Sequence, residues 1–141
     1  MGSRRRILTL VAVVFVALVA GPTGVEAAKK PKPPCQFKLT RNKADHTRVR
    51  IKMICHHKLV VNIRFTFKKH TVKTFKSFPG AQCSIQSKHV AGCIYGSGAP
   101  MNEAVSAVVG VGPPAPAHDQ HFADVQVFIS GGHDYFEPLA Y

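Results

Sequence analysis

Two segments of the chain alternate between apolar and polar side chains, and this alternation constrains the fold more than any other feature. The segments are VRIKM (49–53) and VNIRFTF (61–67), and Arg and Lys occupy several of their polar positions. A period of two is typical of a β-strand that buries one face and leaves the other in water. The sequence therefore predicts strands with an apolar inner face and a cationic outer face.

Other segments share this period, with Gly- or Pro-rich turns between them. The predicted strands cover residues 35–40, 49–55, 61–67, 70–78, 104–111 and 123–130, and residues 83–93 have the length of a short hairpin. About seven short strands, spaced about ten residues apart, predict an all-β antiparallel sandwich or small barrel.

The first predicted strands fit a hairpin in one register. With the turn centred on Asp45, Leu39 lies opposite Ile51, and Cys35 lies opposite Cys55. These side chains share one face, so the hydrophobic pattern and the cysteines support the same pairing. A disulfide between opposed strands is one outcome, and a bridge between two sheets is the alternative. A second hairpin is predicted through HHKL (56–59), joining residues 49–55 to 61–67.

The N-terminus has the composition of a signal peptide. MGSRRR is cationic, and an apolar run of about 14 residues follows it, shorter than the roughly 20 residues of a transmembrane helix. Val25 and Ala27 occupy the small-residue positions of a cleavage site. An uncleaved anchor is the alternative. We predict cleavage near Ala27, a secreted or extracytoplasmic protein, an extended Lys/Pro-rich leader at 28–34, and one domain at 35–141.

Four cysteines follow the predicted cleavage site: Cys35, Cys55, Cys83 and Cys93. An even number in an exported chain predicts two disulfides rather than a metal site or a catalytic thiol. No spacing matches a C-x₂₋₄-C zinc motif. Three pairings are possible, and the residues alone do not choose between them.

The segment CSIQSKHVAGCIYGSGAPMNEAVSAVVGV, within residues 83–130, resembles bacterial extracellular immunoglobulin-like β-sandwich repeats. The shared features are two cysteines around a short hairpin, a glycine turn and a valine-rich strand. In that family these elements precede a last strand similar to ADVQVFIS (123–130). The resemblance implies an immunoglobulin-like sandwich, a Cys83–Cys93 disulfide and a non-enzymatic extracellular role.

Charge is distributed unevenly along the chain. Of its 19 Lys and Arg, three lie in the predicted signal peptide, as does one of its 7 acids, so the mature chain has a net charge of +10. Every Lys and Arg lies at or before Lys88, whereas five of the six remaining acids follow it. Such asymmetry favours a polyanionic partner.

The two predicted hairpins place cations in one row. Lys38 is predicted opposite Lys52, Lys52 opposite Arg64, and Arg48 opposite Lys68. Opposed like charges destabilise a sheet, and a bound anion relieves that repulsion. The predicted anion-binding residues are Lys38, Arg48, Arg50, Lys52, Arg64 and Lys68. The alternative is a solvated face that counterions screen within about 10 Å.

The predicted partner is an anionic polysaccharide, an envelope polymer or an acidic membrane surface, because Lys and Arg suit phosphate and sulfate. Nucleic acid is disfavoured, since base-stacking aromatics are missing from the cationic side. A second hypothesis is a protein-interaction or structural module that uses the acidic, aromatic C-terminal third. There, Tyr135, Phe136 and Tyr141 either cap the core or form a contact strip.

Catalysis and metal binding have less support in the sequence. GSG (96–98) is not a G-x-S-x-G elbow, so we predict neither an enzyme nor a cofactor. His118, His121 and His133 stand beside carboxylates in predicted loops, which suits zinc or copper. Because no HExxH helix or matched ligand pair accompanies them, we favour solvated loop histidines.

Overall fold

The alternating segments form nine β-strands in a computed structural model, which describes residues 32–57 and 59–141. The strands are β1 (Cys35–Arg41), β2 (Arg48–Cys55), β3 (Val60–Thr66), β4 (Thr71–Lys76), β5 (Gln82–Ser87), β6 (Val90–Ile94), β7 (Ala104–Gly112), β8 (Ala123–Ile129) and β9 (Tyr135–Leu139). The described residues contain no helix. The predicted all-β class is confirmed, with more strands than the expected seven.

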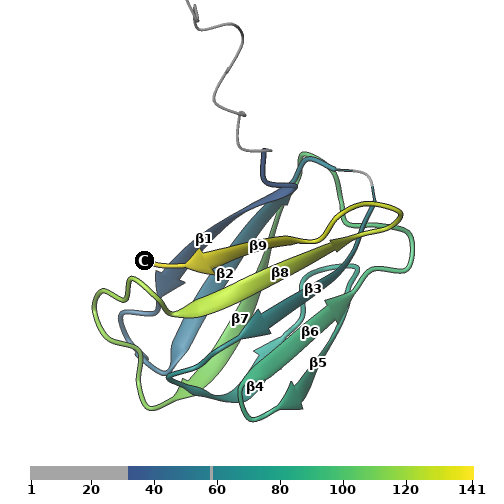
Figure 1. Ribbon diagram of the computed structural model, residues 1–141. Helices are drawn as coiled ribbons and strands as arrows, with labels where there is room; N and C mark the ends of the chain where they lie inside the picture. Colours follow the sequence, from purple (N-terminus) through teal and green to yellow (C-terminus); the bar gives the residue numbers. More distant parts are fainter. Residues whose placement is uncertain (1–31, 58) are drawn as a thin grey trace, which may run out of the picture. The chain divides into compact units, whose positions relative to one another are not determined.

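The strands form two antiparallel sheets in a sandwich-like arrangement (Figure 1). The four-stranded sheet has the order β1-β2-β7-β4, and the five-stranded sheet has the order β5-β6-β3-β8-β9. Strand β7 therefore lies between β2 and β4, although about fifty residues of chain separate it from β2. This crossover decides which side chains share a surface.

One predicted hairpin is confirmed and the other is wrong. Strands β1 and β2 pair in the predicted register, with Leu39 opposite Ile51 and Cys35 opposite Cys55. Strand β3, however, pairs with β6 and β8, and the connection 56–59 carries the chain from one sheet to the other. Period-two alternation shows that a strand has an inner face, but it does not show which sheet the strand joins.

The core lies between the sheets, with Phe65 of β3 at its centre. The Phe65 side chain is 0% exposed. Its ring centroid lies 6.0 Å from that of Phe37 in β1 and 5.8 Å from that of Phe75 in β4, so it contacts both edges of the opposite sheet. A buried phenylalanine contributes about 1.5–3 kcal/mol of hydrophobic free energy. The packing of β3 therefore contributes to holding the two sheets together.

Both predicted disulfides are present, and each joins directly opposed strands of one sheet. Cys35–Cys55 links β1 to β2, with 3.9 Å between the Cα atoms. Cys83–Cys93 closes the β5–β6 hairpin, with 4.0 Å between the Cα atoms. Neither bridge crosses between sheets, and the pairing that the family resemblance implies is confirmed.

Two further features differ from the sequence-based expectation. Strand β9 was not among the predicted strands, because the C-terminal tail was interpreted as a cap or a contact strip. Its Pro138 is tolerated because β9 lies at a sheet edge. Pro34, predicted to lie in a tether outside the core, is buried, and its carbonyl accepts a hydrogen bond from the His56 backbone N–H at 2.7 Å.

The signal peptide predicted at 1–27 and most of the leader lie outside the described residues. Within the described part of the chain, no helix is long and apolar enough to cross a membrane.

Candidate anion-binding face

The outer surface of the four-stranded sheet carries exposed cations from three of its strands. We call this set the basic face: Lys38 from β1, Arg48, Arg50 and Lys52 from β2, and Lys76 from β4. Alternation positions them, because each lies next to a residue whose side chain points into the core. Four of the six predicted anion-binding residues are therefore brought together.

The pairing across the sheet arranges these cations in rows. Lys38 lies directly opposite Lys52, as predicted. On the other side of β2, Arg50 lies opposite Val108 of β7, and Val108 lies opposite Lys76. Opposed like charges such as Lys38 and Lys52 destabilise a sheet by about 0.2–1 kcal/mol. The arrangement thus stores a small repulsion that a bound anion would relieve.

No carboxylate lies within the four strands of this sheet. Their Lys and Arg are Lys38, Arg41, Arg48, Arg50, Lys52, Lys73 and Lys76, and they contain neither Asp nor Glu. Among the described residues, Arg48 is the one member of the basic face in an ion pair, with Asp45 Oδ2 3.3 Å from its Nε. The face is therefore positive almost throughout.

The β1–β2 turn holds Asp45 beside Arg48. Asn42 Oδ1 accepts hydrogen bonds from the Ala44 and Asp45 backbone N–H groups at 2.9 and 3.1 Å. Hydrogen bonds from the Thr47 hydroxyl and backbone N–H, with Arg48 nearby, hold the pKa of the Asp45 carboxyl below its usual value. The ionised Asp45 consequently orients Arg48 at the end of β2.

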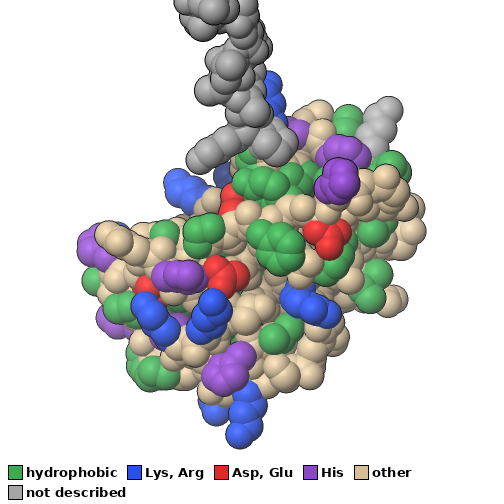
Figure 2. All heavy atoms as spheres, viewed as in Figure 1, with side chains coloured by type: hydrophobic (Ala, Val, Ile, Leu, Met, Phe, Trp, Pro, Cys, Tyr) green, Lys and Arg blue, Asp and Glu red, His purple; other side chains and the backbone are tan. Residues whose placement is uncertain are grey.

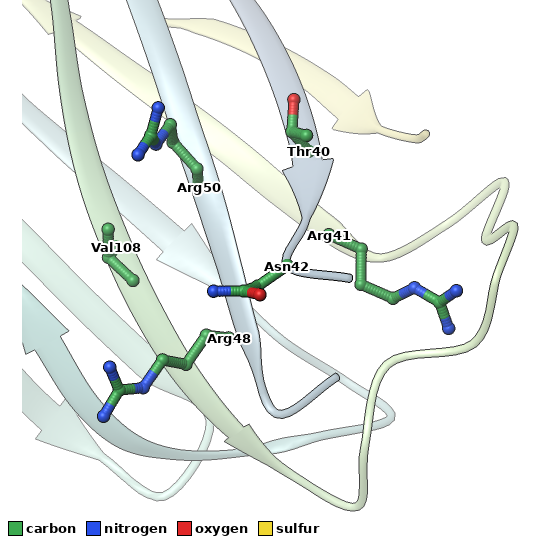
Figure 3. A pocket seen from close by; sticks show the side chains of 6 residues that line it. All are labelled: Thr40, Arg41, Asn42, Arg48, Arg50 and Val108. Carbon is green, nitrogen blue, oxygen red and sulfur yellow. The ribbon is translucent and has the colours of Figure 1, made fainter. Parts of the chain in front are cut away.

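A shallow furrow runs along β7, between the side chains of β2 and β4. Two hollows of about 420 and 380 Å³ lie there, and Arg48 lines both. A third, of about 240 Å³, is lined by Arg48, Arg50 and Val108 together with Thr40, Arg41 and Asn42 from the β1 side. Figure 3 shows Arg48 and Arg50 extending from β2 toward the side of Val108, whereas Arg41 extends the opposite way. Arg41 instead donates a hydrogen bond to the Ala115 carbonyl at 3.2 Å.

The floor of this furrow is made of small, uncharged residues. Val108 and Gly110 face outward from β7 and line the furrow, whereas Ser106, farther along the strand, lines none of its hollows. A Cβ on Gly110 would lie 2.3 Å from Thr74 Oγ1, so the glycine lets the β4 side chain lie across the strand. Strand β7, which lies between the cations of β2 and those of β4, therefore carries no long side chain that would fill the furrow.

Arg64 and Lys68 do not belong to the basic face, which corrects the predicted row. Lys52 lies opposite Ser106 rather than Arg64, and Arg48 lies opposite Gly110 rather than Lys68. Arg64 projects from β3 on the five-stranded sheet, with its guanidinium 6.0 Å from the Phe128 ring centroid. Lys68 follows β3 and pairs with Asp124 at 3.4 Å. Both predictions assumed the second hairpin.

Lys76 and the small residues of β7 were missed by the sequence reasoning. The alternation in TVKTFK places Lys76 outward, and that signal is readable in the sequence. The pairing of β4 with β7, and of β7 with β2, is a long-range contact that no local pattern records.

The outer surface of the five-stranded sheet has a different character. Figure 2, drawn from the same side as Figure 1, shows hydrophobic, acidic and basic side chains interspersed there. Ile94 of β6 is 56% exposed and Phe136 of β9 is 66% exposed. Of the predicted aromatic strip, Phe136 is exposed, whereas Tyr141 packs against Phe122 at 5.5 Å between ring centroids.

The loop histidines do not gather into a cluster. His121 Nε2 lies 2.8 Å from Asp124 Oδ1, while the buried Asp119 faces Lys69 at 3.6 Å and the buried His70 at 3.8 Å. In the described part of the chain, no three His, Cys, Asp or Glu side chains are arranged to hold a metal ion. His118, His121 and His133 are therefore not brought together as a ligand set.

A scan against protein-family models and a search of curated protein sequences returned no match to this chain.

Proposed function

We propose that this chain is an exported binding module that holds an anionic polymer or surface against its basic face. The observation that carries the proposal is the concentration of cations on one sheet whose strands contain no carboxylate. A protein that needed cations only for solubility gains nothing from opposing Lys38 and Lys52. Charge-assisted hydrogen bonds to phosphate or sulfate would turn that repulsion into attraction.

The chemistry of the face favours a polyanion over nucleic acid bases. The aromatic residues of this sheet, Phe37 and Phe75, pack against the core, so no stacking platform accompanies the cations. Proteins that bind single-stranded nucleic acid combine cations with exposed aromatics. Binding rather than catalysis is proposed, since nothing on the face provides a nucleophile with an adjacent base.

An immunoglobulin-like topology is part of this proposal. Variable-type immunoglobulin domains have nine strands, with the order A-B-E-D in one sheet and G-F-C-C′-C″ in the other. If β1, β2, β7 and β4 correspond to A, B, E and D, then β9, β8, β3, β6 and β5 fall in the places of G, F, C, C′ and C″. One departure is that the β5–β6 hairpin follows β4 in the chain instead of preceding it.

Export is proposed from the N-terminal sequence, and the disulfides are consistent with it. Two disulfides among the described residues suit an oxidising, extracellular compartment. There, anionic polysaccharides, envelope polymers and acidic membrane surfaces are the available polyanions.

The test compares two pairs of neutralising substitutions that change the net charge equally. Retention on a sulfated or phosphorylated matrix should fall with salt, with a log–log slope of about −3.5 if all five cations are engaged as on single-stranded polyanions. Arg50→Gln/Lys52→Gln should lower the slope by about 1.4. Arg64→Gln/Lys68→Gln, on the other sheet, should leave it nearly unchanged. Equal effects of the two pairs would reduce the binding to diffuse net charge.

A second candidate function is protein interaction through the outer surface of the five-stranded sheet. The observation that favours it is the exposure of Phe136 and Ile94 on adjacent rows of that surface. Phe136→Ser should then abolish binding to a protein partner without changing retention on a polyanion. A Phe136→Ser protein that binds its partner normally would remove this candidate.

A further inference from the structure

We infer that the ligand of the basic face is an unbranched phosphodiester polymer without bases, such as a polyol phosphate, which lies lengthwise in the furrow along β7. This inference rests on the proposed function and narrows it from polyanions in general to one class. It is drawn from the shape of the furrow, the spacing of the cations and the chemistry of the furrow floor.

The furrow accommodates a narrow chain rather than a flat surface. Its floor is Val108 and Gly110, and its sides are Arg48 and Arg50 of β2 and, across β7, Thr74 and Lys76. Adjacent strands lie about 4.8 Å apart, so β2 and β4 are separated by about 9.6 Å. Arg48 and Arg50 lean over this gap from β2 (Figure 3). Side chains of both β2 and β4 can contact a linear polymer that lies in the furrow. A planar array of headgroups, by contrast, contacts mainly the tips of those side chains.

The repeat of the cations matches that of a phosphodiester chain. Arg48, Arg50 and Lys52 occupy every second position of β2, which places them about 6.8 Å apart along the strand. Two residues of a strand contain six backbone bonds, as does a repeat with a three-carbon bridge between phosphates. When extended, that repeat is also about 7 Å long. Successive phosphates can therefore meet successive cations without a change of register.

The floor of the furrow also argues against the alternatives. A nucleic acid strand has the same six-bond backbone repeat, but its bases find no exposed aromatic side chain on this sheet to stack on. Sulfated polysaccharides are built from rings, which are wider than a polyol chain, and their sulfates do not follow the six-bond repeat. These residues favour a polymer that is thin, regularly charged and free of bases.

The first experiment holds the anion constant and varies its arrangement. We would measure the affinity of the disulfide-bonded protein for poly(glycerol phosphate), for vesicles containing phosphatidylglycerol, for single-stranded DNA and for heparin, each per phosphate or sulfate. The polymer and the vesicle present the same phosphodiester in a linear and a planar form. We expect poly(glycerol phosphate) to bind at least about tenfold more tightly than each of the other three probes. A tenfold difference in affinity corresponds to the free energy of about one charge-assisted hydrogen bond.

The second experiment blocks the furrow without changing any charge. Thr74→Phe and Val108→Phe fill the furrow, because both residues line its hollows, and phenylalanine is compatible with a strand. Gln36→Phe is the matched control, because Gln36 is exposed on β1 of the same sheet but lines none of the three hollows. We expect the furrow variants to lose at least about tenfold in affinity for poly(glycerol phosphate) and the control to bind normally. Thr74→Phe alone serves if Val108→Phe disturbs folding, since Thr74 is exposed.

The outcomes separate this inference from the proposed function. If vesicles, DNA or heparin bind as tightly as poly(glycerol phosphate), or if the blocked variants bind normally, the inference is overturned while anion binding by the basic face stands. If none of the four probes is retained at low salt, both are overturned. Selective binding of the linear polymer that is lost on blocking supports both.

Discussion

The two sheets share one core, yet their outer surfaces differ in charge. The strands of the four-stranded sheet carry seven Lys and Arg and no acid, whereas those of the five-stranded sheet carry Arg64, Asp124 and Glu137. The difference does not simply follow the basic N-terminal and acidic C-terminal parts of the sequence. Strand β7 comes from the acidic part, but its outward residues are uncharged, so its insertion between β2 and β4 leaves the basic face free of acids.

Charge segregation between the two surfaces of this sandwich is set by which sheet each strand joins. Arg64 and Lys52 have similar patterns around them in the sequence, and both are exposed. They lie on opposite surfaces because the connection 56–59 crosses between the sheets.

The largest effect should come from the core that both sheets share. Phe65→Ala removes the ring that contacts Phe37 and Phe75, and we expect the free energy of unfolding to fall by about 3–5 kcal/mol. Phe136→Ala removes a ring that is 66% exposed, and we expect a change within about 0.5 kcal/mol. Urea unfolding of both variants measures the difference. Similar losses would mean that the outer surface of β9 is covered.

The two disulfides should stabilise their sheets by similar amounts. Replacing both cysteines of either bridge by alanine should cost about 3 kcal/mol, because each bridge restricts the unfolded chain. The Cys35–Cys55 loop has a sequence separation of 20 and the Cys83–Cys93 loop one of 10, and that doubling adds about 0.6 kcal/mol. Urea unfolding under oxidising conditions would test this order, and a larger loss for Cys83→Ala/Cys93→Ala would contradict it.

Lys76 tests whether the basic face extends across β7. Because Lys76 lies across Val108 from Arg50, Lys76→Gln should weaken polyanion binding about tenfold and reduce the salt slope by about 0.7. Lys88→Gln is the control, since Lys88 is exposed in the β5–β6 turn on the other sheet. Salt-dependent retention of the two variants gives the answer. Equal losses would mean that binding depends on the net charge of the protein and not on the position of Lys76.

Tyr95 tests the packing at the end of the five-stranded sheet. Among the described residues its buried hydroxyl has no hydrogen-bond partner, and burial raises the pKa of Tyr95 to about 12. Tyr95→Phe should therefore raise the free energy of unfolding by about 1 kcal/mol.

The same residue predicts a pH dependence with a definite sign. A raised pKa means that the folded protein binds the Tyr95 proton more tightly than the unfolded chain, whose tyrosines titrate at about 10. Stability should therefore decline as the pH rises from about 10 toward 12. In Tyr95→Phe this decline should be smaller, as measured by urea unfolding at both ends of that range.

Glu137 should give the smallest effect. Burial raises the pKa of Glu137, opposed in part by the hydrogen bond that it accepts from Tyr135. The folded protein therefore holds this proton more tightly than the unfolded chain, so its contribution to stability decreases as the pH rises through the ordinary glutamate pKa of about 4.3. Relative to the unchanged protein, the urea midpoint of Glu137→Gln should therefore rise between about pH 4 and pH 7. A relative fall over that range would reverse the assignment.

Local pattern in the sequence was enough for most of the strands, their inner faces and the β1–β2 register, although β9 was not among the predicted strands. Alternation identifies the buried side of β2 and β7 because each residue's direction follows from its place in the strand. Lys38 and Lys52 could be paired because a hairpin is a short-range contact. The cysteine count predicted two disulfides, and the pairing of Cys83 with Cys93 followed from the family resemblance.

Tertiary structure alone decided which strands share a sheet, and hence which cations share a surface. Arg64 lies outside the basic face and Lys76 belongs to it, because β3 and β4 pair with strands that are far away in the chain. A strand with one apolar face can pack that face against the core from either sheet of a sandwich. The alternating pattern therefore does not determine which sheet the strand joins. The choice is made by the fit of the whole core around Phe65, and the furrow along β7 is a consequence of that choice.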